Sequence, residues 1–257
     1  MTTFFADVRD TFTSRASPAH GPLAPVLISM TVVTGLVDAF SYLTLGHVFV
    51  ANMTGNVVFL GFALAGAPGF SVLASATALA AFAAGALVGG RLAARHGQHR
   101  GRLHSSAAAA QALFLAASVV LAVLSGSPVG AGYRYALIVG LGTSMGIQNA
   151  AARKLAVPDL TTTVLTLTIT GLAADSALAE GTGSKAGRRV VPIASMLVGA
   201  LIGAALVLHT AIYYPLVIAL VAVMAGAVTT YRLGRPEPAW VRAPAGKPHE
   251  HQERQGP

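Results

Sequence analysis

The sequence predicts an all-α membrane protein, a polytopic bundle of transmembrane helices. Its composition gives two of the reasons. Of the 257 residues, 54% are hydrophobic and only 10% are charged, whereas soluble domains carry roughly 25% charged residues. The third reason is a series of apolar stretches of about 20 residues, the length that a helix needs to cross the hydrocarbon core of a bilayer. The lipid bilayer is therefore the first expected partner.

Six stretches are long and apolar enough to span a membrane. They are 24–46, 71–90, 107–124, 133–151, 190–208 and 211–231. Two weaker stretches, 51–66 and 160–178, begin with polar residues: the first opens with Asn52, Thr54 and Asn56, and the second with a run of threonines. We expect these two to enter and leave the membrane on the same side as half-helices. Eight full spans are the alternative.

The basic residues favour six spans. With six crossings, all but one of the 17 Lys and Arg residues lie on one face, and only Arg134 lies on the other. Eight crossings would divide the charges more evenly. Because Lys and Arg in short loops are retained in the cytoplasm, we predict a multi-pass protein of the bacterial inner (plasma) membrane with both termini cytoplasmic. The net charge of +8 is explained in this way, and no nucleic-acid partner is expected.

The expected domain organisation is simple. Residues 1–23 form a cytoplasmic N-terminal segment, and 24–231 form a single transmembrane domain. The proline-rich, charged residues 232–257 have little to bury and are predicted to be a disordered cytoplasmic tail.

Two pairs of similar runs, in the same order, indicate an internal repeat. The run Gly35-Leu-Val-Asp-Ala39 resembles Gly146-Ile-Gln-Asn-Ala150, and 85–90 (GALVGG) resembles 199–204 (GALIGA). The halves, about 24–124 and 133–231, each contain a span, a weak segment and two more spans. Three crossings are an odd number, so the second half would be inverted relative to the first. Inverted 3+3 repeats with broken helices are typical of secondary transporters.

Small-residue pairs predict where helices pack closely. Gly85 and Gly89, and likewise Gly199 and Gly203, are small-xxx-small patterns that let two helix backbones approach. Contact within one chain is the commoner outcome. Contact between two copies, in a homo-oligomer, is the alternative.

An acidic residue inside a predicted span is the most informative feature for function. An ionised Asp38 at that depth would cost several kcal/mol, so it should face the bundle interior. It is either a structural hydrogen-bonding group, for example with Ser41, or a proton or cation site. The 52–56 run would cap the start of a half-helix beside a cavity, or be an ordinary interfacial cap if the segment spans.

These polar positions define the predicted substrate- or ion-binding site. Its members are Asp38, Ser41, Asn52, Thr54, Asn56, Gln148, Asn149, Thr162 and Thr163. The sequence contains no zinc-protease, phosphate-loop or serine-hydrolase motif, and we expect no enzymatic activity, no cofactor and no metal site. The leading functional prediction is a secondary transporter or permease for a small molecule or ion. The alternative is a non-transporting scaffold or regulatory subunit that binds another membrane protein.

Two runs carry a resemblance to a known family. Residues 34–46 (TGLVDAFSYLTLG) and 48–57 (VFVANMTGNV) resemble the signature of the YoaK family, bacterial membrane proteins classed as a domain of unknown function. Residues 145–150 and the threonine run near Thr162 are also similar. The resemblance covers about 24–231 and implies a polytopic membrane protein, but it implies no substrate and no catalytic residues.

Overall fold

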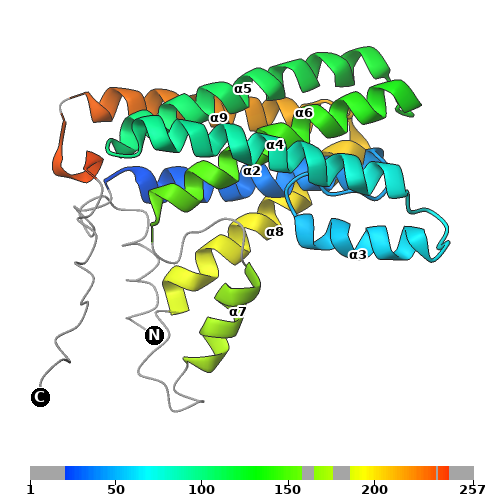
Figure 1. Cartoon of the computed structure of the whole chain (residues 1–257), viewed down its shortest axis with the longest axis horizontal. Coiled ribbons are helices and arrows are strands. Elements are labelled where there is room, and N and C mark those ends of the chain that lie inside the picture. The colour runs from blue at the N-terminus through cyan, green and yellow to red at the C-terminus, as the bar shows by residue number, and fades with distance from the viewer. Residues whose placement is uncertain (1–20, 158–164, 176–185, 236, 243–257) are drawn as a thin grey trace, which may run out of the picture.

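The computed structural model describes residues 21–157, 165–175, 186–235 and 237–242. In these ranges the secondary structure consists of helices, with no strands. Most of the long helices run side by side in roughly one direction, and α8 crosses them obliquely (Figure 1). The predicted all-α helical bundle is therefore confirmed.

Six helices are long enough to cross a bilayer. They are α2 Leu23–Thr44, α4 Val72–His96, α5 Arg100–Ser125, α6 Ala131–Leu155, α8 Ala186–His209 and α9 Tyr214–Gly234. At about 1.5 Å per residue each exceeds roughly 30 Å. Five of them also have the hydropathy of a membrane span. The sixth, α6, is more polar, because it carries Gln148 and Asn149 inside its apolar stretch in addition to Arg134, Arg153 and Lys154 near its ends.

Each long helix corresponds to one of the six predicted spans, and several continue past the apolar stretch. Helix α5, for example, begins at Arg100, whereas the apolar stretch begins at residue 107. The difference arises because backbone hydrogen bonding continues where hydropathy falls, so the helix extends beyond its apolar core.

Two helices are too short to span. Helix α3, Met53–Leu64, has 12 residues and α7, Leu165–Ala174, has 10, so they measure about 18 and 15 Å. They fall in the two stretches predicted to be weak. Both are set apart from the main bundle (Figure 1), and Asn56 is the one buried residue of α3.

The chain around α3 leaves one end of the bundle and returns to it. After α2 ends at Thr44, the backbone turns back until Val50 and Ala51 hydrogen-bond to Asp38, within the last two turns of α2. Helix α3 then leads back out, since His47 before it lies 3.1 Å (Nδ1 to carbonyl oxygen) from Gly69 after it. Residues 47–69 therefore enter and leave the bundle at the same end, and they are called the re-entrant segment below because this is the path predicted for a half-helix.

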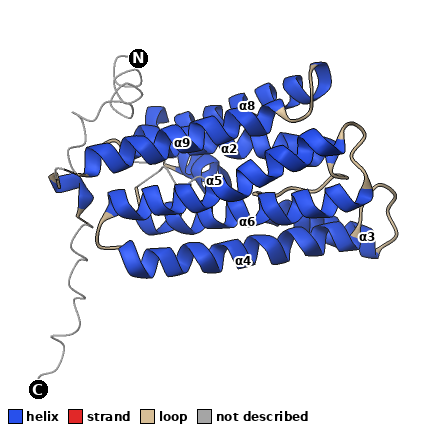
Figure 2. Cartoon of the chain, turned by 90° about the horizontal axis from the view of Figure 1, so that it is seen from above, coloured by secondary structure: helices blue, strands red, loops and turns tan. Residues whose placement is uncertain are grey.

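The tightest helix contacts join the two halves of the chain. Helix α2 packs along α8, and α6 packs along α4; Figure 2 shows α4 beside α6. A Cβ added at Gly35 would lie 2.7 Å from the Ala200 nitrogen, and one at Gly146 would lie 2.7 Å from the Ala86 nitrogen. The other glycines of the predicted packing patterns lie in the same two contacts: Gly199 and Gly203 against α2, Gly85 and Gly89 against α6.

One end of the bundle, here called the basic end, collects the start of α2, α5 and α8 and the end of α4, α6 and α9. A hydrophobic cluster joins these elements there; it includes Leu23, Ala93, Leu103, Leu155, Val191 and Trp240. Most Lys and Arg residues of the described helix ends lie at this end; Arg134, near Gly46, and His209, in the last turn of α8, lie at the other.

The chain beyond α9 departs from the prediction. Residues Ala239–Val241 form a short 3₁₀ helix, η2, in which Trp240 and Val241 are buried. The indole lies against Gly21 and Gly101, where a Cβ would meet the ring. The expectation that residues after 231 have little to bury is wrong for this part, because one tryptophan supplies enough apolar surface to anchor it. Residues 243–257 lie outside the described ranges.

Candidate functional site

A stripe of buried polar side chains runs along one face of α2. Thr34, Asp38 and Ser41 are spaced by four and three residues, so they lie on the same side of the helix. All three are at most 4% exposed. The predicted burial of Asp38 inside the bundle is thus what the structure shows.

The Asp38 carboxylate is bound on one oxygen only. Its Oδ1 accepts hydrogen bonds from the backbone N–H groups of Val50, at 3.0 Å, and Ala51, at 2.8 Å. Its Oδ2 is buried and has no hydrogen-bond partner among the described residues. Ser41 donates its hydroxyl to the Asp38 backbone carbonyl at 3.2 Å, and no bond to the carboxylate is recorded for it.

Asn56 holds the re-entrant backbone in place. Its Oδ1 accepts from the Phe49 N–H at 2.9 Å, and its Nδ2 donates to the Phe49 carbonyl at 2.6 Å. Because the side chain is fully buried, it satisfies two backbone groups that water cannot reach. Asp38 and Asn56 together fix residues 49–51 from two sides.

The side chains of the other two polar residues of the 52–56 run do not join this site. Asn52 and Thr54 are exposed at the start of α3, and the Asn52 side chain caps no backbone N–H. The prediction that Asn52 caps the half-helix is wrong. Its backbone takes φ −90° and ψ 77°, whereas a capping residue normally adopts the extended β region that aims its side chain at the helix N–H groups.

In the second half, Gln148 links three helices. Its Nε2 donates to Thr34 Oγ1 at 2.9 Å on α2, and its Oε1 accepts from Gln111 Nε2 at 2.7 Å on α5. Thr34 lies one turn from Asp38 on the same face of α2. The structure therefore connects Gln148 to the Asp38 stripe through Thr34.

Asn149, the predicted repeat counterpart of Asp38, is also buried. Its Nδ2 donates to the Met145 carbonyl one turn back at 2.9 Å. Its Oδ1 is buried without a partner in the described part of the chain. Thr162 and Thr163, the remaining predicted site residues, lie outside the described residues.

Sequence reasoning missed two buried polar residues of α5. Gln111 belongs to the Gln148 network, and His104 pairs with Thr230 of α9 at 3.0 Å. Both border a small cavity of about 10 Å³, roughly the space of one water molecule. The signal that could have identified Gln111 is its position as an amide within an otherwise apolar span, where polar side chains hydrogen-bond between helices.

This geometry permits two states of the carboxylate. When ionised, Asp38 is stabilised by two N–H donors, and charge-assisted hydrogen bonds are roughly twice as strong as neutral ones. When Oδ2 carries a proton or contacts a cation, those two bonds weaken. The occupancy of Asp38 is therefore coupled physically to how firmly the re-entrant backbone is held.

These features define a multi-pass helical membrane protein with a buried carboxylate beside a re-entrant segment. The chain belongs to the family described as "Protein of unknown function (DUF1275)", whose model matches residues 26–229. It is 40% identical over 157 residues to the UPF0700 transmembrane protein YoaK of Bacillus subtilis (strain 168). The match covers 58% of this chain and 65% of the relative, so the chain spans slightly less than two thirds of that protein. No solved structure matches. The resemblance found in the sequence is confirmed.

Proposed function

We propose that this protein is a secondary transporter or permease for a small molecule or ion. The observation that carries the proposal is the junction of Asp38 with the re-entrant backbone at residues 50–51. Buried acids in membrane spans commonly mark ion and proton paths, and transporter sites lie where helices are broken. The proposed site comprises Asp38, Asn56, Gln148 and Asn149.

The relation between the two halves supports an inverted repeat. Each half contributes three long helices and one short one, and an odd number of crossings inverts the second half. Corresponding residues make corresponding contacts. A Cβ at Gly203 would lie 2.9 Å from the Leu36 carbonyl oxygen, and one at Gly89 would lie 2.9 Å from the Ile147 carbonyl oxygen. The first helix of each half thus packs on the second long helix of the other half, an arrangement in which one unit can rock against the other.

The proposed mechanism couples Asp38 to the re-entrant segment. A proton or cation from the end of the bundle that holds residues 45–52 reaches Oδ2, and the hydrogen bonds to Val50 and Ala51 weaken. The segment, still tied at Phe49 by Asn56, then shifts relative to α2. His47, Arg134 and His209, which ends α8, are among the titratable and basic side chains at this end.

The orientation follows from the charge asymmetry. Lys and Arg flanking the helices gather at the basic end, and the positive-inside rule assigns that end to the cytoplasm. We propose that both termini are cytoplasmic and that the re-entrant segment opens outward.

Transport assays on reconstituted protein test the function. Proteoliposomes loaded with a pH-sensitive dye would be exposed to a panel of cations, anions and small metabolites. We expect protein-dependent flux of at least one of them, and Asp38→Asn should lower its initial rate at least about tenfold, equivalent to about 1.4 kcal/mol. Asp175→Asn, the same chemical change at an exposed acid paired with Arg189, is the control and should transport normally.

A non-transporting scaffold is the competing function. The close packing of Asp38, which is only 3% exposed, favours it, since an open path to the carboxylate is not evident in this conformation. No flux across the whole panel, together with stable co-purification of another membrane protein, would replace the transporter proposal with this one. A single buried carboxylate without a second catalytic group nearby is weak support for an enzyme, so we propose no catalytic activity.

A further inference from the structure

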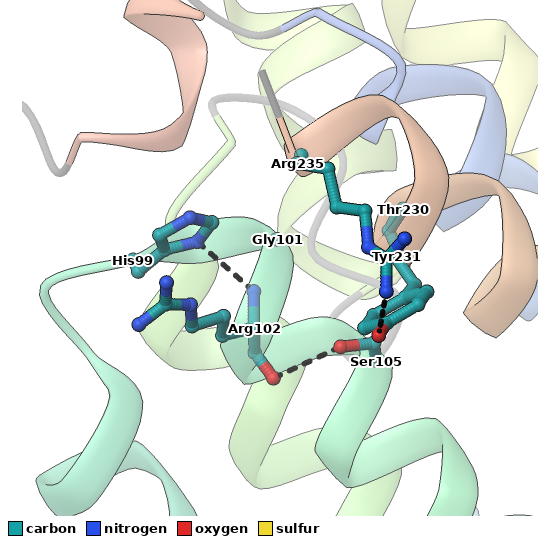
Figure 3. Close-up of a pocket in the computed structure, with 8 residues that line it drawn as sticks. His99, Gly101, Arg102, Ser105, Thr230, Tyr231 and Arg235 are labelled. Carbon is teal, nitrogen blue, oxygen red and sulfur yellow. Dashed lines mark hydrogen bonds between the residues drawn. The ribbon is translucent and has the colours of Figure 1, made fainter. Parts of the chain in front are cut away.

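A hollow of about 260 Å³ lies at the basic end between the start of α5 and the end of α9. Figure 3 shows the side chains around it. They include His99, Arg102 and Ser105 at the start of α5, and Tyr231 and Arg235 at the end of α9. The hollow lies well away from Asp38, which belongs to the opposite part of α2, and the proposed transport site does not use it.

Two guanidinium groups border this hollow. Arg235 donates to the Tyr231 hydroxyl at 2.8 Å and lies 4.8 Å over its ring. Arg102 faces Glu237 at 3.7 Å, with both side chains roughly two-thirds exposed (66% and 62%). Such a long, solvated ion pair contributes about 0–1 kcal/mol, so an anionic ligand can displace Glu237 from Arg102 at little expense.

The backbone adds to the positive potential. Helix α5 begins at Arg100, and its positive dipole end lies beside the hollow. His99 accepts the Arg102 N–H at 3.1 Å through Nδ1. Gly101 also lines the hollow. Arginine pairs and helix starts are both features that recognise phosphate groups.

A second hollow, of about 450 Å³, adjoins the first along the helices. The two share Arg102, Ser105 and Tyr231. The second continues over Ala227 and Val228, one turn of α9 deeper in the bundle, and Val228 is 45% exposed. A ligand that fills both therefore needs an anionic head and an apolar chain. Tyr231 lies at the junction, as tyrosines commonly do at a membrane interface.

From this arrangement we infer that the basic end binds the headgroup of an anionic phospholipid. The phosphate lies between Arg102 and Arg235, and an acyl chain follows α9 over Ala227 and Val228. Phosphate recognition alone would also fit a free phosphate. The adjoining apolar hollow is what selects the lipid, because a free anion would leave it unfilled.

Lipid-dependent thermal unfolding of the purified full-length protein tests this site. Phosphatidylglycerol added to the detergent-solubilised protein should raise the melting temperature, and phosphatidylcholine should raise it much less. The double variant Arg102→Gln/Arg235→Gln should weaken the apparent phosphatidylglycerol affinity about tenfold or more. Arg91→Gln/Arg95→Gln makes the same charge change on exposed residues of α4 outside the hollow, and it should leave the affinity unchanged.

Control ligands show whether the stabilisation comes from the whole lipid or from a phosphate group alone. Inorganic phosphate and glycerol 3-phosphate should give no comparable stabilisation; if either matches the lipid, the site binds free anions and the inference is wrong. Equal stabilisation by phosphatidylcholine, or equal loss in both double variants, would also overturn it. If the Gln variant does not fold, the unmodified protein still decides the question, because its stabilisation by phosphatidylglycerol must decline as salt rises. Arg102→Lys/Arg235→Lys, which retains the charge, should keep binding.

Discussion

At the residue scale, Asn56 shows how one side chain can replace secondary structure. Residues 45–52 are not helical, so their backbone groups lack the internal partners that a membrane environment demands. The Asn56 amide presents both donor and acceptor atoms: its oxygen accepts from the Phe49 N–H, and its nitrogen donates to the Phe49 carbonyl and to Met53 Sδ. An aspartate or a leucine of similar size could not do this, because neither presents both a donor and an acceptor at neutral pH.

We predict that Asn56→Ala destabilises the protein by about 2 kcal/mol or more, since two backbone groups of the half-buried Phe49 each lose a partner worth about 1–3 kcal/mol. The midpoint of unfolding in detergent measures this loss. Asn52→Ala is the matched control. Its side chain is exposed and caps nothing, so the change should stay within about 0.5 kcal/mol. Equal effects of the two substitutions would contradict the assigned role of Asn56.

The same residues show which features of the candidate site can be predicted from the sequence. Asp38 is identifiable from the sequence because an acid within an apolar stretch has few tolerable places. Its partners are not, since the backbone amides of Val50 and Ala51 have no residue type to recognise. Asn52 and Asn56 look alike in the sequence, yet one is exposed and the other fully buried. Only the path of the chain after Thr44 distinguishes them.

At the element scale, the closest packing joins α2 to α8 and α6 to α4 through glycines. At Gly85 an added Cβ would meet the Thr143 carbonyl oxygen, and the backbone of α6 has no room to retreat. Such contacts hold helices together in lipid, where dispersion and backbone proximity replace the hydrophobic effect.

Gly85→Ala should therefore destabilise the protein by about 1–3 kcal/mol through overpacking. Gly90→Ala, five residues further along the same helix, meets no atom within 4 Å. It should be neutral, or stabilise by up to about 1 kcal/mol because alanine favours helix over glycine. Thermal unfolding of both variants in the same detergent makes the comparison. If Gly90→Ala destabilised the protein and Gly85→Ala did not, the face of α4 that contacts α6 would have been assigned wrongly.

Element lengths and element partners differ in how predictable they are. Apolar run length predicts the six long helices and the two short ones, because bilayer thickness fixes how long a spanning helix must be. The small-xxx-small pattern says that Gly85 and Gly89 allow close approach. The pattern does not predict which helix packs there, because any helix with small residues at the contact could approach as closely. The predicted repeat adds information, because Gly89 and Gly203, which match in the two runs, lie against Ile147 and Leu36, which also match.

At the scale of the whole molecule, the ends of the bundle differ in chemistry. The basic end gathers arginines, a buried tryptophan and the proposed lipid site. The opposite end carries the re-entrant segment and an aromatic cluster in which Phe59 stacks on Phe49 at 5.6 Å. The proposed lipid site would join α5 of the first half to α9 of the second at one end, whereas the proposed transport site lies toward the other end.

The topology on which this depends predicts the sidedness of three loops. If residues 47–69 are re-entrant, cysteines placed at His47 and Ala65 lie on the same side of the membrane, and one at Gln98, beyond α4, lies on the other. All three positions are exposed, and the native chain has no cysteine to interfere. Labelling intact cells with a membrane-impermeant maleimide should modify the first two. Gln98→Cys should react only after the membrane is opened.

The pair at 47 and 65 is the decisive one. A spanning α3 would place these two cysteines on opposite sides, because the chain would then cross between them. Helix α3 measures only about 18 Å, and His47 contacts Gly69, so a crossing would require both the helix and that contact to rearrange. Opposite labelling would therefore remove the re-entrant segment, and with it the junction at Asp38 on which the proposed transport site rests.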